Sequence, residues 1–352
     1  MLFSEIPAAQ LADTIRSHTF VATDAATLPT ENIVLLGCAS DPAIADAVRA
    51  ALANMAQPML AETCAIADLG NLPPTASAAA ACEQIAATLQ PLIAAGKFIL
   101  LLGDDSALQF GQFLAYEGLE KRVCVADISA HFTAATLLDY SPTPLFDYTL
   151  LGYQRYFMAE ETLNALHARH YTPLRYGDLA DDLRHAEPFL RDAHLAHFSL
   201  SAIRRMDAPA TARPSVGGFS AMEACRLARY AGMSPRLSSF FCSDMRPDSS
   251  QQTPQLAALL LWYAIEGYTH RHYDHPSNGG AHFQKYAVTL TLTELPLIFY
   301  QNTATERWWL EIPQAKHTAP MIVACSERDF RLARENALPD RWWAMFERGL
   351  KN

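Results

Sequence analysis

Short apolar runs alternate along this chain with longer stretches in which apolar residues recur every three or four positions. Runs of the first kind indicate strands buried on both faces, and stretches of the second kind are typical of amphipathic helices. The expected strands cover residues 33–37, 98–102, 123–128, 148–152, 172–176, 194–200 and 237–242. The expected helices cover residues 44–55, 78–96, 107–118, 159–170, 182–192, 222–230 and 253–268. This alternation predicts an α/β fold whose mainly parallel central sheet is flanked by helices on both faces.

The pattern changes after residue 268. Residues 269–282 are rich in His, Gly, Asn and Pro, which predicts a loop. Beyond the loop, β-prone segments follow at residues 286–293, 296–300 and 307–312. We therefore expect one α/β domain over residues 1–268 and a C-terminal β-containing extension over residues 269–352, packed on the same domain as an antiparallel annex or edge.

Three of the predicted strands end in polar side chains. These are Asp104 and Asp105 after the strand 98–102, Asp127, Ser129 and His131 after the next strand, and Ser199 and Ser201 after a third. Residues two apart in a strand point to the same face of a sheet. Because open α/β sheets bind ligands at the carboxyl ends of their strands, we expect these groups to share one cleft that could take a small-molecule ligand.

The order and spacing of these segments resemble those of the ureohydrolases, the superfamily of arginase, agmatinase and formimidoylglutamase. Its motifs are Gly-Gly-Asp-His-Ser, Asp-Ala-His-x-Asp and Ser-x-Asp-x-Asp, followed by a Pro-Gly-Gly turn and a Glu-x-Asn-Pro segment. The corresponding segments here are 102–106, 127–131, 197–201, 214–220 and 244–247. The resemblance covers about residues 95–268 and implies the three-layer arginase/deacetylase-type fold. The C-terminal part, with its two Arg-Trp-Trp triplets, is similar to a bacterial arginase-like branch with degenerate metal-binding motifs.

The resemblance also implies two manganese ions at the strand ends, but most of their ligands are replaced. Asp105 stands where the first motif has its ligand His, while Ser129 and His131 replace His and Asp in the second. Only Asp127 keeps its residue type. The late segment begins with Asp244 in place of Glu.

Ser199 and Ser201 stand at the positions of the two aspartates that bridge the metal ions in the family. Two divalent cations about 3.5–4 Å apart need carboxylates that bridge them, and hydroxyls that are neutral at pH 7 do not supply that charge. We therefore expect no metal cofactor. The alternative is manganese held by Asp105, Asp127 and His131. Two other interpretations stay open: Asp105 could cap the following helix, and the serine pair could bond to nearby backbone.

Ureohydrolases attack a guanidinium or amidine carbon with metal-bound hydroxide. Without the metal pair, we expect a catalytically inactive arginase- or formimidoylglutamase-like protein with a ligand-binding or regulatory role. The alternative is a metal-dependent hydrolase of linear amidine C–N bonds, such as that of formimidoylglutamate, with an atypical metal site. A third hypothesis is an interaction scaffold that uses the Trp-rich extension. The expected remnants of the cleft are Asp104, Asp105, Asp127, Ser129, His131, Ser199, Ser201 and Asp244.

The composition of the chain limits which classes of partner we expect it to bind. The 352 residues are 50% hydrophobic and 18% charged with a net charge of −10, which argues against a nucleic-acid partner. No run of about eighteen apolar residues is present, and residues 1–20 lack the pattern of a signal peptide. The seven cysteines are scattered, which fits buried free thiols in a reducing compartment. We expect a cytoplasmic protein without a membrane partner, and the resemblance implies a homo-oligomer.

Two other groups of residues could have a function. A zinc site could form from the close group His270, His272, Asp274 and His275, but histidines in a Gly-rich loop are more often solvated. The tryptophan pairs at 308–309 and 342–343 are typical of packing residues, and we expect Arg307 and Arg341 to lie over their rings.

Overall fold

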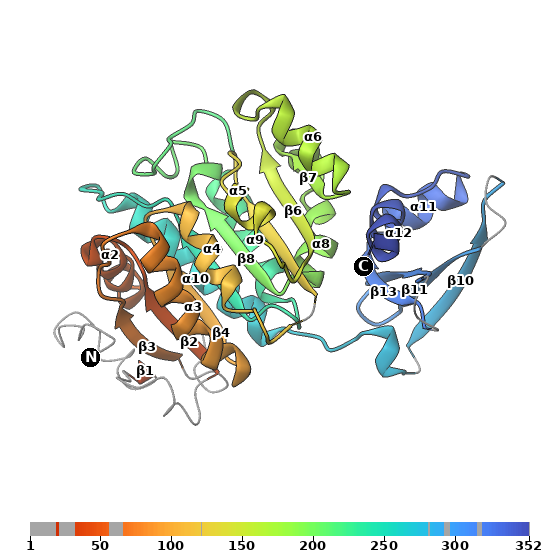
Figure 1. The fold of residues 1–352 in the computed structure, drawn as a ribbon, viewed down its shortest axis with the longest axis horizontal. Coiled ribbons are helices and arrows are strands. Elements are labelled where there is room, and N and C mark those ends of the chain that lie inside the picture. The colour runs from red at the N-terminus through yellow and green to blue at the C-terminus, as the bar shows by residue number, and fades with distance from the viewer. Residues whose placement is uncertain are drawn as a thin grey trace.

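The molecule combines a large parallel sheet, covered by helices on both faces, with a smaller antiparallel sheet that lies to one side (Figure 1). The computed structural model describes residues 19–20, 32–55, 66–120, 122–280, 282–291, 296–314 and 319–351. The sequence-based expectations for residues 1–18 and for Cys64 lie outside these ranges.

The central sheet has nine strands in the order β1-β3-β2-β4-β9-β8-β5-β6-β7, and every pairing in it is parallel. They are β1 (Thr19–Phe20), β2 (Ile33–Gly37), β3 (Ile66–Asn71), β4 (Phe98–Leu102), β5 (Val123–Ile128), β6 (Leu145–Tyr153), β7 (Thr172–Arg175), β8 (Leu195–Ser199) and β9 (Ser239–Ser243). The predicted α/β fold with a mainly parallel sheet is confirmed.

The α-helices of this part are α2 (Pro42–Ala53), α3 (Ala78–Ala94), α4 (Gln109–Leu114), α5 (Ala135–Asp139), α6 (Glu160–Ala168), α7 (Tyr176–Asp181), α8 (Glu187–Asp192), α9 (Ala221–Gly232) and α10 (Gln252–Thr269). Short 3₁₀ turns are η4 (Ser106–Leu108), η5 (Arg155–Phe157), η6 (Leu183–Ala186), η7 (Leu200–Ala202) and η8 (Pro276–Asn278). The expected helix over 182–192 is divided into η6 and α8, because Pro188 lies in the first turn of α8 and lacks the N–H that a continuous helix would need.

Two hydrophobic cores lie on opposite faces of the central sheet. Along β4, Phe98, Leu100 and Leu102 belong to the core shared with α2, α9 and α10. Ile99 and Leu101 belong to the core shared with α3, α4 and α6. This alternation explains why β4 is apolar at every position: each face of the strand is buried under helices.

The C-terminal part forms its own four-stranded antiparallel sheet, in the order β10-β11-β12-β13. Its elements are β10 (Phe283–Thr289), β11 (Pro296–Asn302), β12 (Trp308–Ile312), β13 (Met321–Cys325), α11 (Glu327–Arg334) and α12 (Asp340–Lys351). The predicted β-containing extension is confirmed, and it is a separate sheet, not an edge of the central one. Its core includes Cys124 and Phe146 of the central sheet, so the two sheets share a packed boundary.

Arginine side chains cross this boundary in an arrangement that differs from the expectation. Arg191 of α8 lies over the ring of Trp309, 4.5 Å from its centroid, and Arg341 lies over Phe189 at 4.3 Å. Arg307 instead forms ion pairs with Asp274 and Glu187. The expected stacking of Arg307 and Arg341 on the tryptophans was therefore wrong, because Arg307 pairs with two partly buried carboxylates and Arg341 pairs with Asp192 and stacks on Phe189.

The sequence also predicts that the cysteine and tryptophan side chains are buried. The cysteines described, Cys38, Cys82, Cys124, Cys225, Cys242 and Cys325, are all free and buried, as predicted. Trp308, Trp309 and Trp342 are buried as packing residues, whereas Trp343 is 47% exposed. Within the described ranges, no helix is both long and apolar enough to cross a membrane.

Candidate functional site

The polar residues singled out in the sequence come from four neighbouring strands. In the sheet order, β4, β9, β8 and β5 are adjacent and parallel, so their carboxyl ends lie along one edge. The turn at residues 214–220 packs against this edge, and Gly218 there has φ of 139°. A Cβ at Gly218 would lie 2.4 Å from the carbonyl oxygen of Ala202, so the turn requires glycine.

Asp244 receives hydrogen bonds from both serines that the resemblance places at bridging positions. The hydroxyls of Ser199 and Ser201 donate to Oδ2 of Asp244, at 3.2 Å for Ser201. The backbone N–H of Ser106 donates to Oδ1 at 3.2 Å. Asp244 is buried and has φ of 64°, a left-handed conformation that aspartate tolerates better than most residues. Protein donors thus satisfy the charge of this carboxylate.

A second buried network starts from Asp127. Its Oδ2 accepts from the hydroxyl of Tyr148 at 2.5 Å, and its Oδ1 lies 2.8 Å from Nδ1 of His197. Nε2 of His197 lies 2.6 Å from Oγ of Ser243. Burial first, and then the charge of Asp127, raise the pKa of Tyr148 well above its ordinary value. Asp127 is therefore held by two donors that belong to the protein.

The order Ser243, His197, Asp127 is that of a catalytic serine triad. However, all three side chains are 0% exposed, so no substrate can reach the serine. The network is a structural one. His197 and Ser243 were not among the residues selected from the sequence. The available signal was that His197 shares its strand face with Ser199, two positions away.

Asp104 and Asp105 have different roles. Asp104 is buried and accepts from the backbone N–H of Ser40 at 3.1 Å and from its hydroxyl. Its carbonyl oxygen accepts from Nη1 of Arg246 at 2.5 Å. Asp105 is exposed and accepts from the N–H of Ala107 at 2.8 Å, so it caps the turn η4. The capping interpretation of Asp105 is thus correct.

Ser129 and His131 also bond locally. The hydroxyl of buried Ser129 donates to the carbonyl oxygen of His131 at 2.6 Å. The imidazole of His131 stacks on Phe157 with centroids 4.6 Å apart. Burial first, and then Arg213, lower the pKa of His131, against an opposing effect of Asp244. A neutral imidazole stacked on an aromatic ring explains this position without a metal ion.

The dimanganese pair implied by the family does not fit this set of donors. Among the described residues, no group of three or more His, Cys, Asp or Glu side chains gathers as a metal site would require. Asp105, Asp127 and His131 form no such group, and neither do the histidines at 270, 272 and 275. Both oxygens of Asp127 are hydrogen-bonded within the protein, and the hydroxyls of Ser199 and Ser201 donate to Asp244.

A cavity of about 580 Å³ opens at the same edge of the sheet. It lies among the loops that follow β2, β3 and β4, with Ser40, Asp104, Asp105 and Arg246 in its wall. Its volume falls in the range of small-molecule sites, roughly 300–1,000 Å³. Asp127, Ser199 and Ser201 do not line it. Of the residues expected to share one cleft, only Asp104 and Asp105 line this cavity, and the carbonyl oxygen of Asp104 accepts from Arg246, which also lines it.

Comparisons with known proteins agree with the resemblance. Residues 37–142 match the model of the arginase family, and no curated protein matches the sequence. Formimidoylglutamase from Bacillus subtilis has a TM-score of 0.65 at 14% identity, covering 77% of this chain and 96% of its own. Formiminoglutamase from Trypanosoma cruzi has a TM-score of 0.60 at 16% identity, and the match covers 69% of this chain and 94% of that protein. Arginase from Bacillus subtilis has a TM-score of 0.56 at 17% identity, and the match covers 67% of this chain and 98% of that protein. The family match over residues 37–142 and the shared fold confirm the resemblance of this chain to the arginases and formimidoylglutamases of the ureohydrolase superfamily.

Proposed function

We propose that this chain is a catalytically inactive arginase- or formimidoylglutamase-like protein that binds a small ligand at the carboxyl edge of its central sheet. The observation that carries the proposal is that the hydroxyls of Ser199 and Ser201 donate to Asp244. In the resemblance described above, these are the positions of the metal-bridging aspartates. In this proposal, hydrogen bonds replace the metal ions as the groups that neutralise the buried carboxylates. No cofactor is proposed.

The cavity beside Asp104 is the proposed ligand site. It offers the exposed carboxylate of Asp105 and the guanidinium of Arg246, which suits a small polar molecule with both an acceptor and a donor. A regulatory role would then arise from ligand-dependent stability, since a ligand that binds only the folded state stabilises it.

The test is manganese uptake by the wild type and by the variant Ser199→Asp/Ser201→Asp, measured by elemental analysis after incubation with manganese and desalting. We expect less than about a tenth of an ion per wild-type chain and a clear increase in the variant, because the two carboxylates restore the bridging charge. Ala87→Glu/Ser249→Asp adds two carboxylates at exposed positions and serves as the matched control. Thermal unfolding with and without manganese shows whether the ions bind the folded protein.

Tight binding of about two manganese ions by the wild type would refute the proposal. The alternative, a metal-dependent hydrolase of linear amidines, is kept because residues 37–142, which include Asp105, Asp127 and His131, match the arginase family. Turnover of formimidoylglutamate by the wild type that disappears on chelation would support this alternative. Cytoplasmic location, a homo-oligomer and the absence of a nucleic-acid partner remain predictions from the sequence.

A further inference from the structure

A second cavity, of about 500 Å³, lies where the central sheet meets the C-terminal part. Cys124 and Phe146 contribute to its wall from the central sheet, and Trp309, Ile322 and Met345 from the C-terminal elements. This wall is largely apolar. The same cavity is also lined by three arginines, Arg122, Arg191 and Arg236. Their hydrogen-bond partners decide what the cavity can bind.

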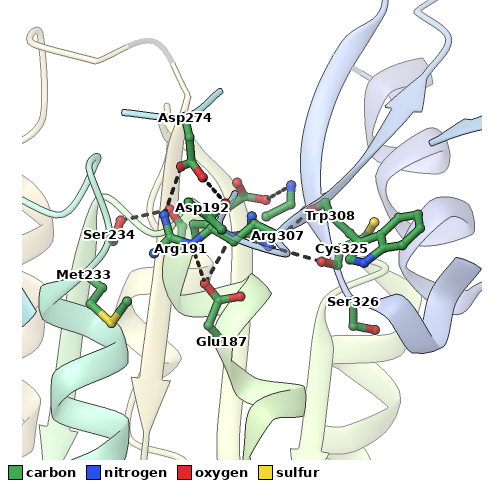
Figure 2. A network of polar contacts seen from close by, with 12 residues as sticks. Glu187, Arg191, Asp192, Met233, Ser234, Asp274, Arg307, Trp308, Cys325 and Ser326 are labelled. Atoms are coloured by element: carbon green, nitrogen blue, oxygen red, sulfur yellow. Dashed lines mark hydrogen bonds and ion pairs between the residues drawn. The ribbon is translucent and has the colours of Figure 1, made fainter. Parts of the chain in front are cut away.

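Arg191 is buried but incompletely paired. Its Nη2 donates to the carbonyl oxygens of Trp308 and Cys325, at 3.2 and 3.1 Å, and its Nε lies 3.2 Å from Glu187 (Figure 2). The guanidinium covers the ring of Trp309. Nη1 has no hydrogen-bond partner among the described residues, although the side chain is only 5% exposed. A buried guanidinium N–H without an acceptor indicates a place for an additional oxygen.

Arg236 faces a donor instead of an acceptor. Nδ1 of His194 accepts from the N–H of Cys124 at 3.0 Å, so a neutral ring carries its hydrogen on Nε2. Nε2 lies 3.0 Å from Nη2 of Arg236. Burial, and then Arg236, lower the pKa of His194 to about 3, so the ring is neutral at pH 7. Two N–H groups therefore point at each other, and the described residues give the guanidinium of Arg236 no oxygen acceptor.

Arg122 has no carboxylate partner within the described ranges. Its guanidinium lies over the ring of Phe146, 4.9 Å from the centroid. Its hydrogen bond in the structure is to the thioether sulfur of Met321, at 4.0 Å, and sulfur is a weak acceptor. Within the described part of the chain, all three arginines that line the cavity thus have N–H groups without an oxygen partner.

The carboxylates in the cavity wall are bound elsewhere. Asp192 accepts from Nη2 of Arg341 at 2.6 Å and from the N–H of Ala324 at 2.9 Å. Asp274 accepts from Nη1 of Arg307 at 3.0 Å, as Figure 2 shows. The cavity wall and the residues paired with it contain five arginines and three carboxylates, an excess of two positive charges in a chain of net charge −10. The arginines are Arg122, Arg191, Arg236, Arg307 and Arg341, and the carboxylates are Asp192, Asp274 and Glu187.

We propose that this cavity binds a small organic anion. Its carboxylate or phosphate oxygens accept from Arg122, Arg191 and Arg236, and its apolar body packs against Phe146, Trp309 and Met345. The site is separate from the cavity beside Asp104 and does not depend on the function proposed for that edge. Because its walls come from both sheets, binding also holds the C-terminal part against the central sheet.

The test is isothermal titration calorimetry of the full chain with phenylacetate, with phenyl phosphate and with the neutral analogue phenylacetamide. We expect at least one anion to bind and the amide not to bind. Arg122→Gln and Arg236→Gln should each weaken binding about tenfold or more, since each removes a charged donor. Arg226→Gln, an exposed arginine on α9, is the matched control and should leave the affinity unchanged.

The variants also separate binding from folding. Arg236 is exposed and Arg122 is half-buried, so their glutamine variants should unfold at the temperature of the wild type. Ile322→Trp fills the cavity from its apolar side without changing a charge and should abolish binding. Preference for one of the two anions identifies the carboxylate or the phosphate as the group recognised. The proposal is overturned if neither anion binds the wild type at about 10 mM, or if both glutamine variants bind as tightly as the wild type.

Discussion

At the scale of single residues, serines at positions 199 and 201, where the resemblance leads us to expect aspartates, decide which charges can be buried together. A serine hydroxyl can donate a hydrogen bond to Asp244, whereas an aspartate carboxylate at the same position could only repel it. Asp127 likewise accepts hydrogen bonds, with Tyr148 and His197 as the donors. The buried carboxylates of Asp127 and Asp244 are therefore stabilised by hydrogen bonds from specific residues, and removing one member should leave others unsatisfied.

Replacing Asp127 by Ala tests this argument. The change leaves the hydroxyl of Tyr148 and the ring of His197 buried without their acceptor, which should lower the free energy of unfolding by about 3–5 kcal/mol. Asp105→Ala removes an exposed cap and should cost about 1 kcal/mol. Urea denaturation followed by circular dichroism measures both values. Equal costs for the two variants would show that the Asp127 network contributes no special stability.

At the scale of elements, α8 connects the two sheets. It has six residues, too few to be stable as an isolated helix, so its stability comes from packing. Arg191 reaches the carbonyl oxygens of Trp308 and Cys325, and the next residue, Asp192, accepts from Ala324 and Arg341. One short helix therefore binds β12, β13 and α12 through adjacent side chains.

Replacing Asp192 by Ala should weaken this connection. Arg341 would remain buried without its carboxylate, and we expect a loss of about 3–5 kcal/mol in the free energy of unfolding. The amide of Ala324 loses its acceptor, so its hydrogen exchange should accelerate. Asp181→Ala, an exposed position at the end of α7, is the control and should change neither value. Unchanged exchange at Ala324 in the Asp192 variant would argue against the role of α8.

At the scale of the whole molecule, the two sheets share part of a hydrophobic core and several buried ion pairs. Phe146 of the central sheet packs in the core of the C-terminal part, and Asp147 pairs with Arg348 of α12 at 2.5 Å. Parts that share buried charges and apolar contacts lose both when either unfolds. We therefore expect the central and C-terminal parts to unfold as one unit.

This expectation can be checked without mutation, because four of the five tryptophans lie in the C-terminal elements and one, Trp262, lies in α10. Tryptophan fluorescence therefore reports mainly on the C-terminal part, and far-ultraviolet circular dichroism on the whole chain. The two urea transitions should coincide. A fluorescence transition at clearly lower urea would mean that the C-terminal part unfolds independently.

The strands of the central sheet could be predicted from the sequence because their signal is local. The strand Phe98–Leu102 is apolar throughout, and it lies where the pattern placed it. β3 was missed because it contains Asp68, whose carboxylate is buried against Arg49 of α2, a partner distant in the sequence. Helices α11 and α12 were missed as well, although Trp342 and Met345 of α12 pack in the core of the C-terminal part.

The sequence by itself determined the fold class and most of the strands and helices of the central part, because these depend on residue identity and local periodicity. Only the tertiary structure decided which partner each buried polar group has: Ser199 and Ser201 with Asp244, and His197 with Asp127. It also decided that Nη1 of Arg191 finds no hydrogen-bond partner among the described residues. A hydrogen bond acts over about 3 Å, and folding alone brings residues distant in the chain within that range.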